Sequence, residues 1–554
     1  MKKTLRKLFA VMVAMTCLLS GCGSSAYEES NTYTYDEAVK ELESKLTKVN
    51  YTEVDAPLDI YDVDTERKTL ADISTFPLTV QGNGAINIEI AAATELSADA
   101  PDDLINVLAK KFNNSKVEVD GKTVSVSIRK ITSGEVLTYM TEGDYRPDVY
   151  IPSSYAWGEM LKAKGIDVIK LTDRIAGNTA GILMEEKTYD TFIEKYQEIT
   201  VDKVLEASLA GDLTFAYTNP YTSSTGLNIL TAMLHSFDAS NPLSDDAAQK
   251  LLEYQKQSPP VAYTTAVLRT QASKGIIKAM VMEEQAYHNA PELRDYVYVP
   301  AGIRHDHPVY TFDYVSSEKQ AAARKFVEYC LSNEAQKVAD EKGFNLHNDY
   351  EEQSPGLDGA GYLAAQKIWK VNKDGGKPII AVFIADVSGS MDGEPLNALK
   401  DSLISTASYI SSDNYIGLVS YSDDVYINLN IEQFDETQRA YFSGAVKSLT
   451  ANGGTATYDA VLVALDMLRT KAEEIPDAKL MLFVLSDGVQ NSGYSLNRIT
   501  DIVGGMRVPV YTIGYNLNSP GELKELSNIN EAALIDAQTD DIVNQLRNLF
   551  NVQL

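Results

Sequence analysis

The strongest constraint on the fold lies in the last third of the chain, where short apolar runs alternate with amphipathic stretches. The apolar runs are residues 379–385, 415–421, 480–485 and 508–515. Runs of this length between helical patterns are typical of βαβ units around a parallel sheet. We therefore expect an α/β domain over residues 378–554, with a mainly parallel central sheet flanked by helices.

Polar residues follow two of these runs, and a glycine-rich segment between them adds another. Five oxygen-bearing side chains are expected at one edge of the sheet: Asp386, Ser388, Ser390, Thr455 and Asp487. Thr457 is an alternative to Thr455, two residues further along. Ligands of open α/β sheets bind at the carboxyl ends of the strands. An all-oxygen set suits a hard cation such as Mg²⁺, Mn²⁺ or Ca²⁺ rather than zinc.

This order, D-x-S-x-S, then T, then D, resembles the metal-ion-dependent adhesion site of von Willebrand factor A (VWA) domains. The resemblance implies a Rossmann-like VWA domain in which the five residues bind a divalent cation, with Mg²⁺ expected first. It also implies an open coordination position that a carboxylate from a protein partner fills. A single D-x-S-x-S segment is also a common turn, so the prediction depends on the full set.

The residues present in 378–554 disfavour an enzymatic function for this domain. All five histidines lie outside residues 378–554: His235, His288, His305, His307 and His347. A serine hydrolase needs a base beside its nucleophile, and an aspartyl-nucleophile phosphatase would need a second Asp at position 388. The H-D-H segment at 305–307 lacks further zinc ligands and is expected to be a loop.

The N-terminus predicts export and lipid attachment. Basic residues precede an apolar stretch at 8–19 that is too short for a durable membrane span. The L-S-G-C segment that ends at Cys22 resembles a bacterial lipobox, which implies a signal peptide over residues 1–21 and diacylation of Cys22. We expect an extracytoplasmic protein anchored to the cell membrane by that lipid. An ordinary signal peptide with an incidental cysteine is the alternative.

The charge of the chain limits the classes of partner, and its cysteine content limits the possible disulfides. The chain has 49 basic and 78 acidic residues, a net charge of −29. This balance disfavours nucleic acid and anionic membrane surfaces as partners. Once Cys17 leaves with the signal and Cys22 carries lipid, Cys330 is the remaining cysteine, and its helical spacing predicts a core position.

Residues 84–350 predict a second α/β unit. Three segments carry a further resemblance: D-V-x-x-P-S-S at 148–154, N-P-x-x-S-S-x-G at 219–226, and the closing helical stretch 321–344. In this order they resemble bacterial extracellular solute-binding proteins of the type II periplasmic fold. The resemblance implies two α/β lobes with a ligand cleft at their hinge.

The predicted ligand site of this unit is the hydroxyl-rich helix start at 221–226. Hydroxyls and free N–H groups at a helix N-terminus attract an anion or carboxylate, although the same residues also simply cap helices. The candidate cleft residues are Thr94, Ser153, Ser154, Tyr221, Ser223, Ser224 and Thr225. No arginine–aspartate set for sulfate or phosphate is apparent, so the sequence does not identify the small solute.

Two segments connect these units. Residues 22–83 comprise the lipidated cysteine, a tether and a helix at 35–49, and the pattern does not say which domain they pack on. Residues 351–377 predict a glycine-rich linker with a short helix around 362–371. The expected function is a cell-surface lipoprotein that binds an acidic partner through its metal site. The alternative is the substrate receptor of an ABC-type importer with a regulatory VWA domain.

Overall fold

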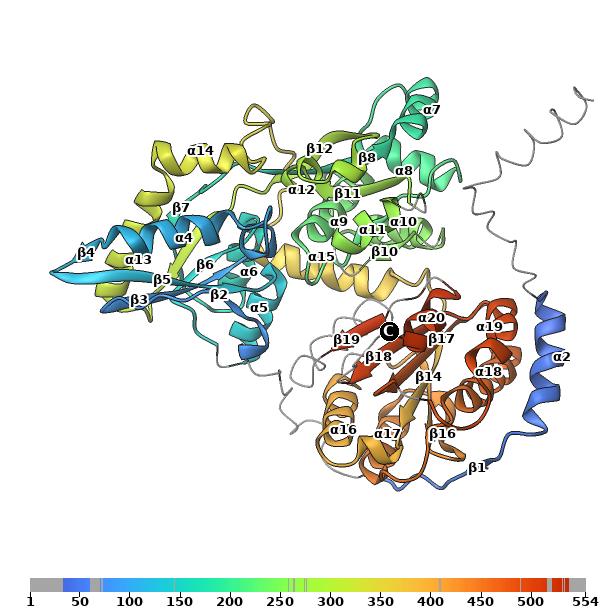
Figure 1. Cartoon of the computed structure of the whole chain (residues 1–554). Helices are drawn as coiled ribbons and strands as arrows, with labels where there is room; N and C mark the ends of the chain where they lie inside the picture. The colour runs from blue at the N-terminus through green and yellow to red at the C-terminus, as the bar shows by residue number, and fades with distance from the viewer. Residues whose placement is uncertain are drawn as a thin grey trace, which may run out of the picture.

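The computed structural model contains two α/β domains (Figure 1). It describes residues 33–59, 70, 73–143, 145–257, 259–262, 265–273, 275, 277–407, 410–488, 490–515, 521–530, 532 and 534–537. The predicted signal peptide and Cys22 lie outside these residues. Among the helices described, none has the length and apolar character needed to cross a membrane. The two domains are called here the middle domain (residues 78–356) and the C-terminal domain (residues 379–537).

The C-terminal domain is built on a seven-stranded sheet of order β1-β16-β15-β14-β17-β18-β19. Its strands are β1 (Tyr51–Glu53), β16 (Val425–Gln433), β15 (Tyr415–Tyr421), β14 (Ile379–Asp386), β17 (Lys479–Ser486), β18 (Val510–Tyr515) and β19 (Leu534–Ala537). Every neighbouring pair is parallel except β15 and β16. The mainly parallel sheet predicted from the sequence is therefore confirmed.

Helices cover both faces of this sheet. They are α16 (Glu394–Ala407), α17 (Glu436–Ser448), α18 (Thr457–Glu474), α19 (Thr500–Met506) and α20 (Gly521–Asn528). Successive residues of the fully buried β14 point to opposite faces. Phe383 packs in the core shared with α16 and α17, whereas Val382 and Ile384 pack in the core shared with α18 and α19. The side chains of β14 therefore pack against the helices on both faces of the sheet.

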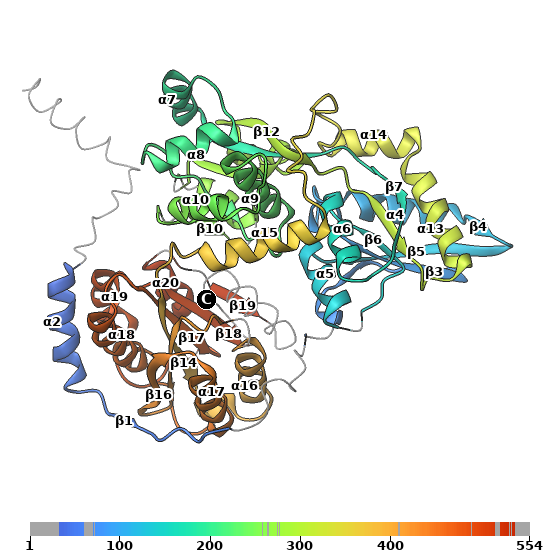
Figure 2. The ribbon, with the colours of Figure 1, turned by 180° about the vertical axis from the view of Figure 1, so that it is seen from behind.

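The segment that precedes the middle domain is part of the C-terminal domain. Strand β1 pairs in parallel with β16 at the edge of the sheet, and helix α2 (Tyr35–Leu46) packs on α18 and α19. Thr34 caps α2 in a capping box with Glu37, and Ala38 and Leu42 are fully buried. Figures 1 and 2 show this blue segment beside the red domain from both sides. In sequence, the middle domain is therefore inserted into the C-terminal domain.

The first lobe of the middle domain contains a sheet of order β2-β5-β3-β6-β13-β7, with β4 paired to β5. The strands are β2 (Leu78–Val80), β3 (Ile86–Ala92), β4 (Glu118–Val119), β5 (Lys122–Lys130), β6 (Val149–Ile151), β7 (Val168–Thr172) and β13 (Val309–Phe312). The helices are α3 (Thr94–Ser97), α4 (Leu104–Ser115), α5 (Ser133–Thr141), α6 (Tyr155–Ala163), α13 (Ser317–Cys330) and α14 (Asn333–Glu341). Cys330 is buried in this core as predicted.

The second lobe contains an antiparallel sheet of order β11-β8-β12 and a short pair of β9 and β10. The strands are β8 (Thr179–Glu185), β9 (Tyr217–Thr218), β10 (Val261–Ala262), β11 (Ala279–Glu283) and β12 (Tyr296–Arg304). The helices are α7 (Glu186–Tyr196), α8 (Val201–Leu209), α9 (Ser224–Phe237), α10 (Asp245–Gln255), α11 (Thr265–Ser273) and α12 (Glu284–His288). The predicted two-lobed α/β architecture is confirmed.

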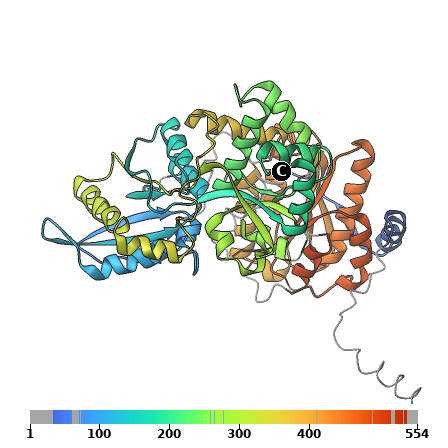
Figure 3. The same ribbon diagram turned by 90° about the horizontal axis from the view of Figure 1, so that it is seen from above.

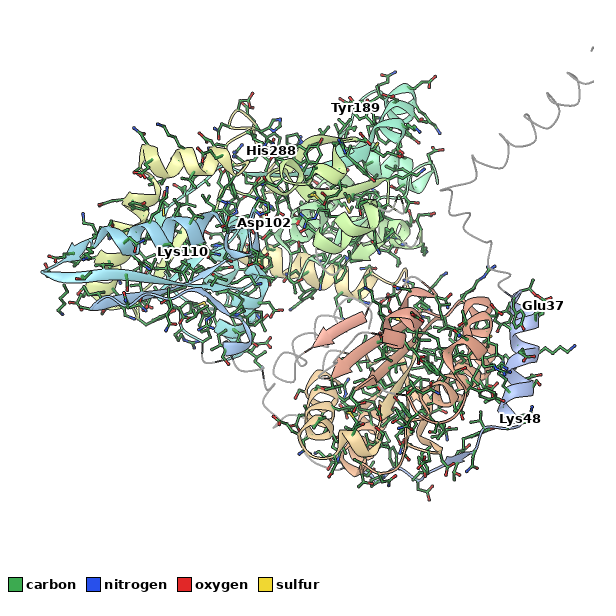
Figure 4. All side chains as sticks on the ribbon, in the orientation of Figure 1. Glu37, Lys48, Asp102, Lys110, Tyr189 and His288 are labelled. Atoms are coloured by element: carbon green, nitrogen blue, oxygen red, sulfur yellow. The ribbon has the colours of Figure 1, made fainter. Side chains whose placement is uncertain are left out.

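The chain crosses between the lobes twice, at residues 173–178 and 305–308. The two crossings bond to each other, because the Ile175 N–H donates to the Asp306 carbonyl at 3.1 Å and the His305 N–H donates to the Asn178 carbonyl at 3.0 Å. They form the hinge. Figure 4 labels Asp102 where the lobes meet, and there its Oδ1 accepts a bond of 2.7 Å from Gln285 Nε2.

Helix α15 (Gly359–Asn372) spans both lobes and leads into β14. It packs on α6 of the first lobe and on α9 and α10 of the second (Figure 3). Gln366 Nε2 donates to the Pro220 carbonyl at 2.8 Å, and Trp369 Nε1 donates to the Tyr217 hydroxyl at 2.8 Å. The helix predicted around 362–371 is therefore longer than expected, and it bridges the two lobes.

Candidate metal centre and ligand cavity

Asp386 stands at the end of the central strand β14 and is fully buried. Its Oδ2 accepts bonds from the Ser486 hydroxyl at 2.6 Å and the Tyr421 hydroxyl at 3.2 Å. Its Oδ1 accepts a bond of 2.9 Å from the Ser388 N–H. These donors come from the ends of the two neighbouring strands and from the following loop, so the carboxylate is fixed in orientation.

The two serines of the D-x-S-x-S segment lie together. The hydroxyl oxygens of Ser388 and Ser390 are 3.0 Å apart, and a short 3₁₀ turn follows Ser388. Ser388 is buried, whereas Ser390 is exposed. The segment therefore has one buried hydroxyl, on Ser388, and one that solvent reaches, on Ser390.

The glycine-rich loop packs directly on this segment. The Gly389 N–H donates to the Gly453 carbonyl at 3.0 Å, and the Asn452 N–H donates to the Val387 carbonyl at 2.8 Å. Gly453 has φ +72°, a backbone conformation that favours glycine. Thr455 is buried in this loop, and its N–H is held by Asn491 Oδ1 at 2.8 Å.

Thr457, the alternative to Thr455, lies at the start of α18. Its hydroxyl donates to the Tyr421 hydroxyl at 3.2 Å, and Tyr421 in turn donates to Asp386. Thr457 is thus engaged in a chain of hydrogen bonds behind the carboxylate. The loop position of Thr455 favours it over Thr457 as the residue that faces the site.

Asp487 follows β17 and completes the set. Its Oδ1 is buried and has no hydrogen-bond partner in the described part of the chain. Burial raises the pKa of Asp386 above its ordinary value, and the negative charge of Asp487 adds to that increase. An unpaired buried carboxylate oxygen is costly, and a hard cation is a group that would satisfy it.

The fold therefore brings the five predicted residues to the carboxyl edge of one sheet. No group of three or more His, Cys, Asp or Glu side chains with metal-site spacing occurs within the described residues. The five-residue set contains only two carboxylates, so hydroxyl groups would have to supply the remaining protein oxygens.

A small cavity of about 60 Å³ lies between the lobes of the middle domain. Its lining residues are Thr94, Glu95, Thr132, Ser133, Ser153, Thr222, Ser223, Ser224, Thr225, Thr265 and Glu283. Five of the seven predicted cleft residues are among them: Thr94, Ser153, Ser223, Ser224 and Thr225. The other two are not. Ser154 is the buried N-cap residue of α6, and Tyr221 packs against Trp369 with ring centroids 6.1 Å apart.

Six lining residues are not among the seven candidates, although one of them, Thr222, lies within the predicted helix start 221–226. Thr132 and Ser133 follow β5 just as Thr94 and Glu95 follow β3, so the rule that ligands bind beyond strand ends would have found them. Glu283 ends β11 in the same way. Thr222 and Thr265 lie at or next to the starts of α9 and α11.

The two lobes meet at this cavity through their helix starts. The Gly134 N–H at the start of α5 donates to the Thr222 carbonyl at 3.4 Å, next to the start of α9. Trp157 Nε1 of the first lobe donates to the Ser224 hydroxyl of the second lobe at 2.7 Å. The cavity is thus lined by residues from both lobes.

Two glutamates complete the lining, Glu283 buried and Glu95 partly buried, and each is paired with a hinge histidine. Glu95 Oε1 lies 3.2 Å from His307 Nε2, and Glu283 Oε1 lies 3.3 Å from His305 Nδ1. Burial acts to raise the pKa of Glu95, but the bond and charge of His307 lower it below its usual value. Burial and the neighbouring Glu95 raise the pKa of Glu283.

Two family models match the chain. One describes a bacterial extracellular solute-binding protein and matches residues 94–345. The other describes a von Willebrand factor type A domain and matches residues 381–550. The two matches fall on the middle domain and the C-terminal domain respectively.

Similarity to curated proteins is confined to part of their length. Inter-alpha-trypsin inhibitor heavy chain H3 of Bos taurus is 28% identical over 160 residues, which are 26% of this chain and 17% of that protein. The uncharacterized protein sll0103 of Synechocystis sp. is 24% identical over 140 residues, 25% of this chain and 32% of that protein. The chain thus spans less than a third of either relative.

Solved structures are similar to part of this chain. Iron-bound HitA from Pseudomonas aeruginosa is 15% identical, with a TM-score of 0.39, over 52% of this chain and 99% of that one. A von Willebrand factor type A protein from Catenulispora acidiphila is 20% identical, with a TM-score of 0.29, over 32% of this chain and 42% of that one.

Proposed function

Because this chain joins a bacterial extracellular solute-binding domain to a von Willebrand factor type A domain, we propose that it is a cell-surface binding protein. Its VWA domain binds a protein or other acidic ligand through a divalent cation, and its middle domain binds a small solute. Lipid on Cys22, a residue outside the described part of the chain, anchors it to the outer side of the cell membrane.

One observation supports the metal site most directly. The Asp487 Oδ1 atom is buried without a hydrogen-bond partner in the described part of the chain. The negative charge of Asp487 also raises the pKa of the buried Asp386 carboxylate. Two carboxylates that repel each other in a partly dry setting are stabilised by a cation between them. The neighbouring hydroxyls of Ser388 and Ser390 are neutral, so they add ligands without adding charge.

The cation would be held by Asp386, Ser388, Ser390, Thr455 and Asp487, with Mg²⁺ as the expected ion. When bound, it supplies a positive charge that an acidic side chain of a partner can meet at the exposed Ser390. Asp386 stays fixed by Ser486 and Tyr421 throughout, because its hydrogen bonds come from the scaffold of the sheet. The role of these residues is to bind and orient.

Calorimetry on the full chain tests the proposal. Mg²⁺ or Mn²⁺ should bind the wild type, and Asp386→Ala should abolish binding because it removes the central carboxylate. Asp392→Ala is the matched control, since Asp392 is an exposed carboxylate in the same loop. Equal metal affinity in the wild type and Asp386→Ala would refute the metal site.

The second candidate is the substrate receptor of an ABC-type importer, with the VWA domain as a regulator of docking. The cavity between the lobes favours it. For such a receptor, partner capture should be indifferent to EDTA and should change with Ser223→Ala or Ser224→Ala. The metal-dependent proposal predicts the opposite pattern.

A further inference from the structure

The charge of the cavity between the lobes points to a particular class of solute. Its lining holds two carboxyl groups, those of Glu95 and Glu283, and no lysine or arginine. We propose that the cavity binds a small zwitterion, an amino acid with a primary ammonium group. The ammonium lies at the two glutamates and the carboxylate at the hydroxyl-rich helix starts. This inference rests on the proposed solute-binding role of the middle domain.

The end for the carboxylate is formed by α5 and α9, one from each lobe. Helix N-termini carry a partial positive charge and unpaired N–H groups, which favour a carboxylate. Thr222 is only 8% exposed, and its hydroxyl is one of the few buried polar groups of the described residues that lack a partner. A buried polar group without a partner is unusual in a folded protein, so a ligand atom is the natural partner for Thr222.

Ser224 contributes to the same end. Its oxygen accepts the hydrogen bond from Trp157 Nε1, so its own O–H is available to donate. The contact between Gly134 and Thr222 places the starts of α5 and α9 against each other. The two helix starts therefore meet on one side of the cavity, where the hydroxyls of Thr222 and Ser224 are the donors offered to a ligand.

The end for the ammonium lies on the hinge side. His305 and His307 belong to the hinge crossing, and they contact Glu283 and Glu95 respectively. His307 contacts Oε1 of Glu95, whose carboxyl group also bonds the Ser153 side chain, and His305 contacts Oε1 of Glu283. The glutamate side chains are 7% and 12% exposed, so both are nearly removed from solvent. An ammonium beside both carboxyls would offset their mutual repulsion.

Other classes of solute fit this lining less well. A doubly charged oxyanion would be repelled by Glu95, since no lining residue carries a positive side chain. A quaternary ammonium is recognised by aromatic faces, and none of the lining residues is aromatic. The volume of about 60 Å³ favours a short side chain.

A panel of matched probes on the full chain tests the inference. Calorimetry after dialysis would compare glycine and L-alanine with glycolate, ethylammonium and sulfate. Glycolate replaces the ammonium by a hydroxyl, and ethylammonium lacks the carboxylate. We expect glycine or L-alanine to bind at least about tenfold more tightly than the other probes, a difference of about 1.4 kcal/mol.

Two variants locate the binding. Glu283→Gln and Thr222→Val should each weaken binding of the zwitterion by at least about tenfold, the loss typical of an unpaired buried polar group. Glu253→Gln, on the exposed face of α10, is the control and should leave binding unchanged. Unfolding followed by tryptophan fluorescence checks that the variants are folded, because both tryptophans, Trp157 and Trp369, lie in or on the middle domain.

The outcomes separate two kinds of failure. Binding of sulfate, glycolate or ethylammonium in preference to glycine and L-alanine would overturn the ligand class while supporting a solute-binding role. Unchanged glycine affinity in folded Glu283→Gln would also overturn it. Binding of no probe at all would count against the solute-binding role itself, and the metal affinity of the VWA domain is measured separately.

Discussion

Ala38 of α2 lies directly against Gly505 of α19: a methyl group added to Gly505 would come within 2.7 Å of the Ala38 Cβ atom. Helix α2 therefore packs closely on the VWA domain. Together with the pairing of β1 and β16, this contact makes the leader a structural part of a domain that resumes more than 300 residues later.

We predict that Leu42→Ala destabilises the VWA domain by about 2–5 kcal/mol, because it removes a fully buried leucine from the core shared with α18 and α19. Far-UV circular dichroism during denaturant unfolding should show a transition shifted to lower denaturant. The unfolding transition followed by tryptophan fluorescence should be unchanged. Trp157 lies in the core of the middle domain, and Trp369 lies on α15, which packs on that domain.

Ser44→Ala is the control for the leader, because Ser44 is exposed on the same helix. Its free energy of unfolding should stay within about 0.5 kcal/mol of the wild type. If Leu42→Ala behaved like Ser44→Ala, the leader would not be part of the VWA core.

Continuous apolar strands were the easiest elements to predict. The runs at 379–385, 415–421 and 480–485 match β14, β15 and β17 to within one residue at each end. Strands buried on both faces have such near-continuous hydrophobic sequences. Strand β16 was not predicted, because only some of its residues are buried and polar residues interrupt its pattern. The three-residue β1 is too short and too exposed to show any pattern.

The candidate sites were predictable to different degrees. The predicted metal set comes from local motifs, so each of its residues can be proposed from its own stretch of sequence. The cavity depends on which residues face each other across the hinge, such as Glu95 and Glu283, and one-dimensional patterns do not contain that information. The neighbours Ser153 and Ser154 illustrate this limit, since only Ser153 lines the cavity.

A second prediction concerns the repulsion between Asp386 and Asp487 when EDTA keeps metal from the site. In the presence of EDTA, Asp487→Asn should stabilise the VWA domain by about 1 kcal/mol, because it removes a charge that repels the buried Asp386. In saturating Mg²⁺ the order should reverse, because the wild type alone gains stability from the bound ion. Thermal unfolding followed by circular dichroism measures both. A variant that is less stable in both conditions would contradict the metal site.

The third prediction is a pH dependence at the junction of the two domains. Burial, together with the nearby Lys373, lowers the pKa of Lys370 from 10.5 to about 7. Between pH 7 and 10.5 the unfolded chain therefore binds more protons than the folded chain. The free energy of unfolding should rise with pH across this range, and below pH 7 the cost of burying the charge is fully present.

Lys370→Met should reduce this slope and stabilise the protein at neutral pH, while the buried Lys373, whose pKa is also lowered, keeps part of it. Lys370 is only partly buried, so solvent limits the gain to about 1–2 kcal/mol. Lys367→Met is the control, since Lys367 is exposed on the same helix and should keep the wild-type slope. Denaturant unfolding at several pH values, followed by tryptophan fluorescence, reports the difference. Parallel curves for the wild type and Lys370→Met would exclude the effect.

A fourth prediction concerns attachment. Cys22→Ser should release the protein from membranes into the medium or periplasm, because lipid on Cys22 is the only apolar anchor that the sequence predicts. Cys330→Ser leaves that anchor in place and should stay with the membrane fraction. Membrane fractionation with a salt wash distinguishes them. A Cys22→Ser protein that remains on washed membranes would disprove the lipoprotein assignment.

The last prediction links the metal to the partner. If an acidic side chain of the partner completes the coordination, metal and partner must strengthen each other's binding by the same factor, because linkage is reciprocal. Asp386 and Asp487 repel an incoming carboxylate unless a cation lies between them. EDTA, Ser390→Ala and Thr455→Ala should therefore each release the partner in a pull-down from cell-surface material. Ser223→Ala and Ser224→Ala should retain it, since these residues line the solute cavity of the other domain. Capture that survives EDTA and fails in the cavity variants would move the binding surface to the middle domain and favour the importer receptor.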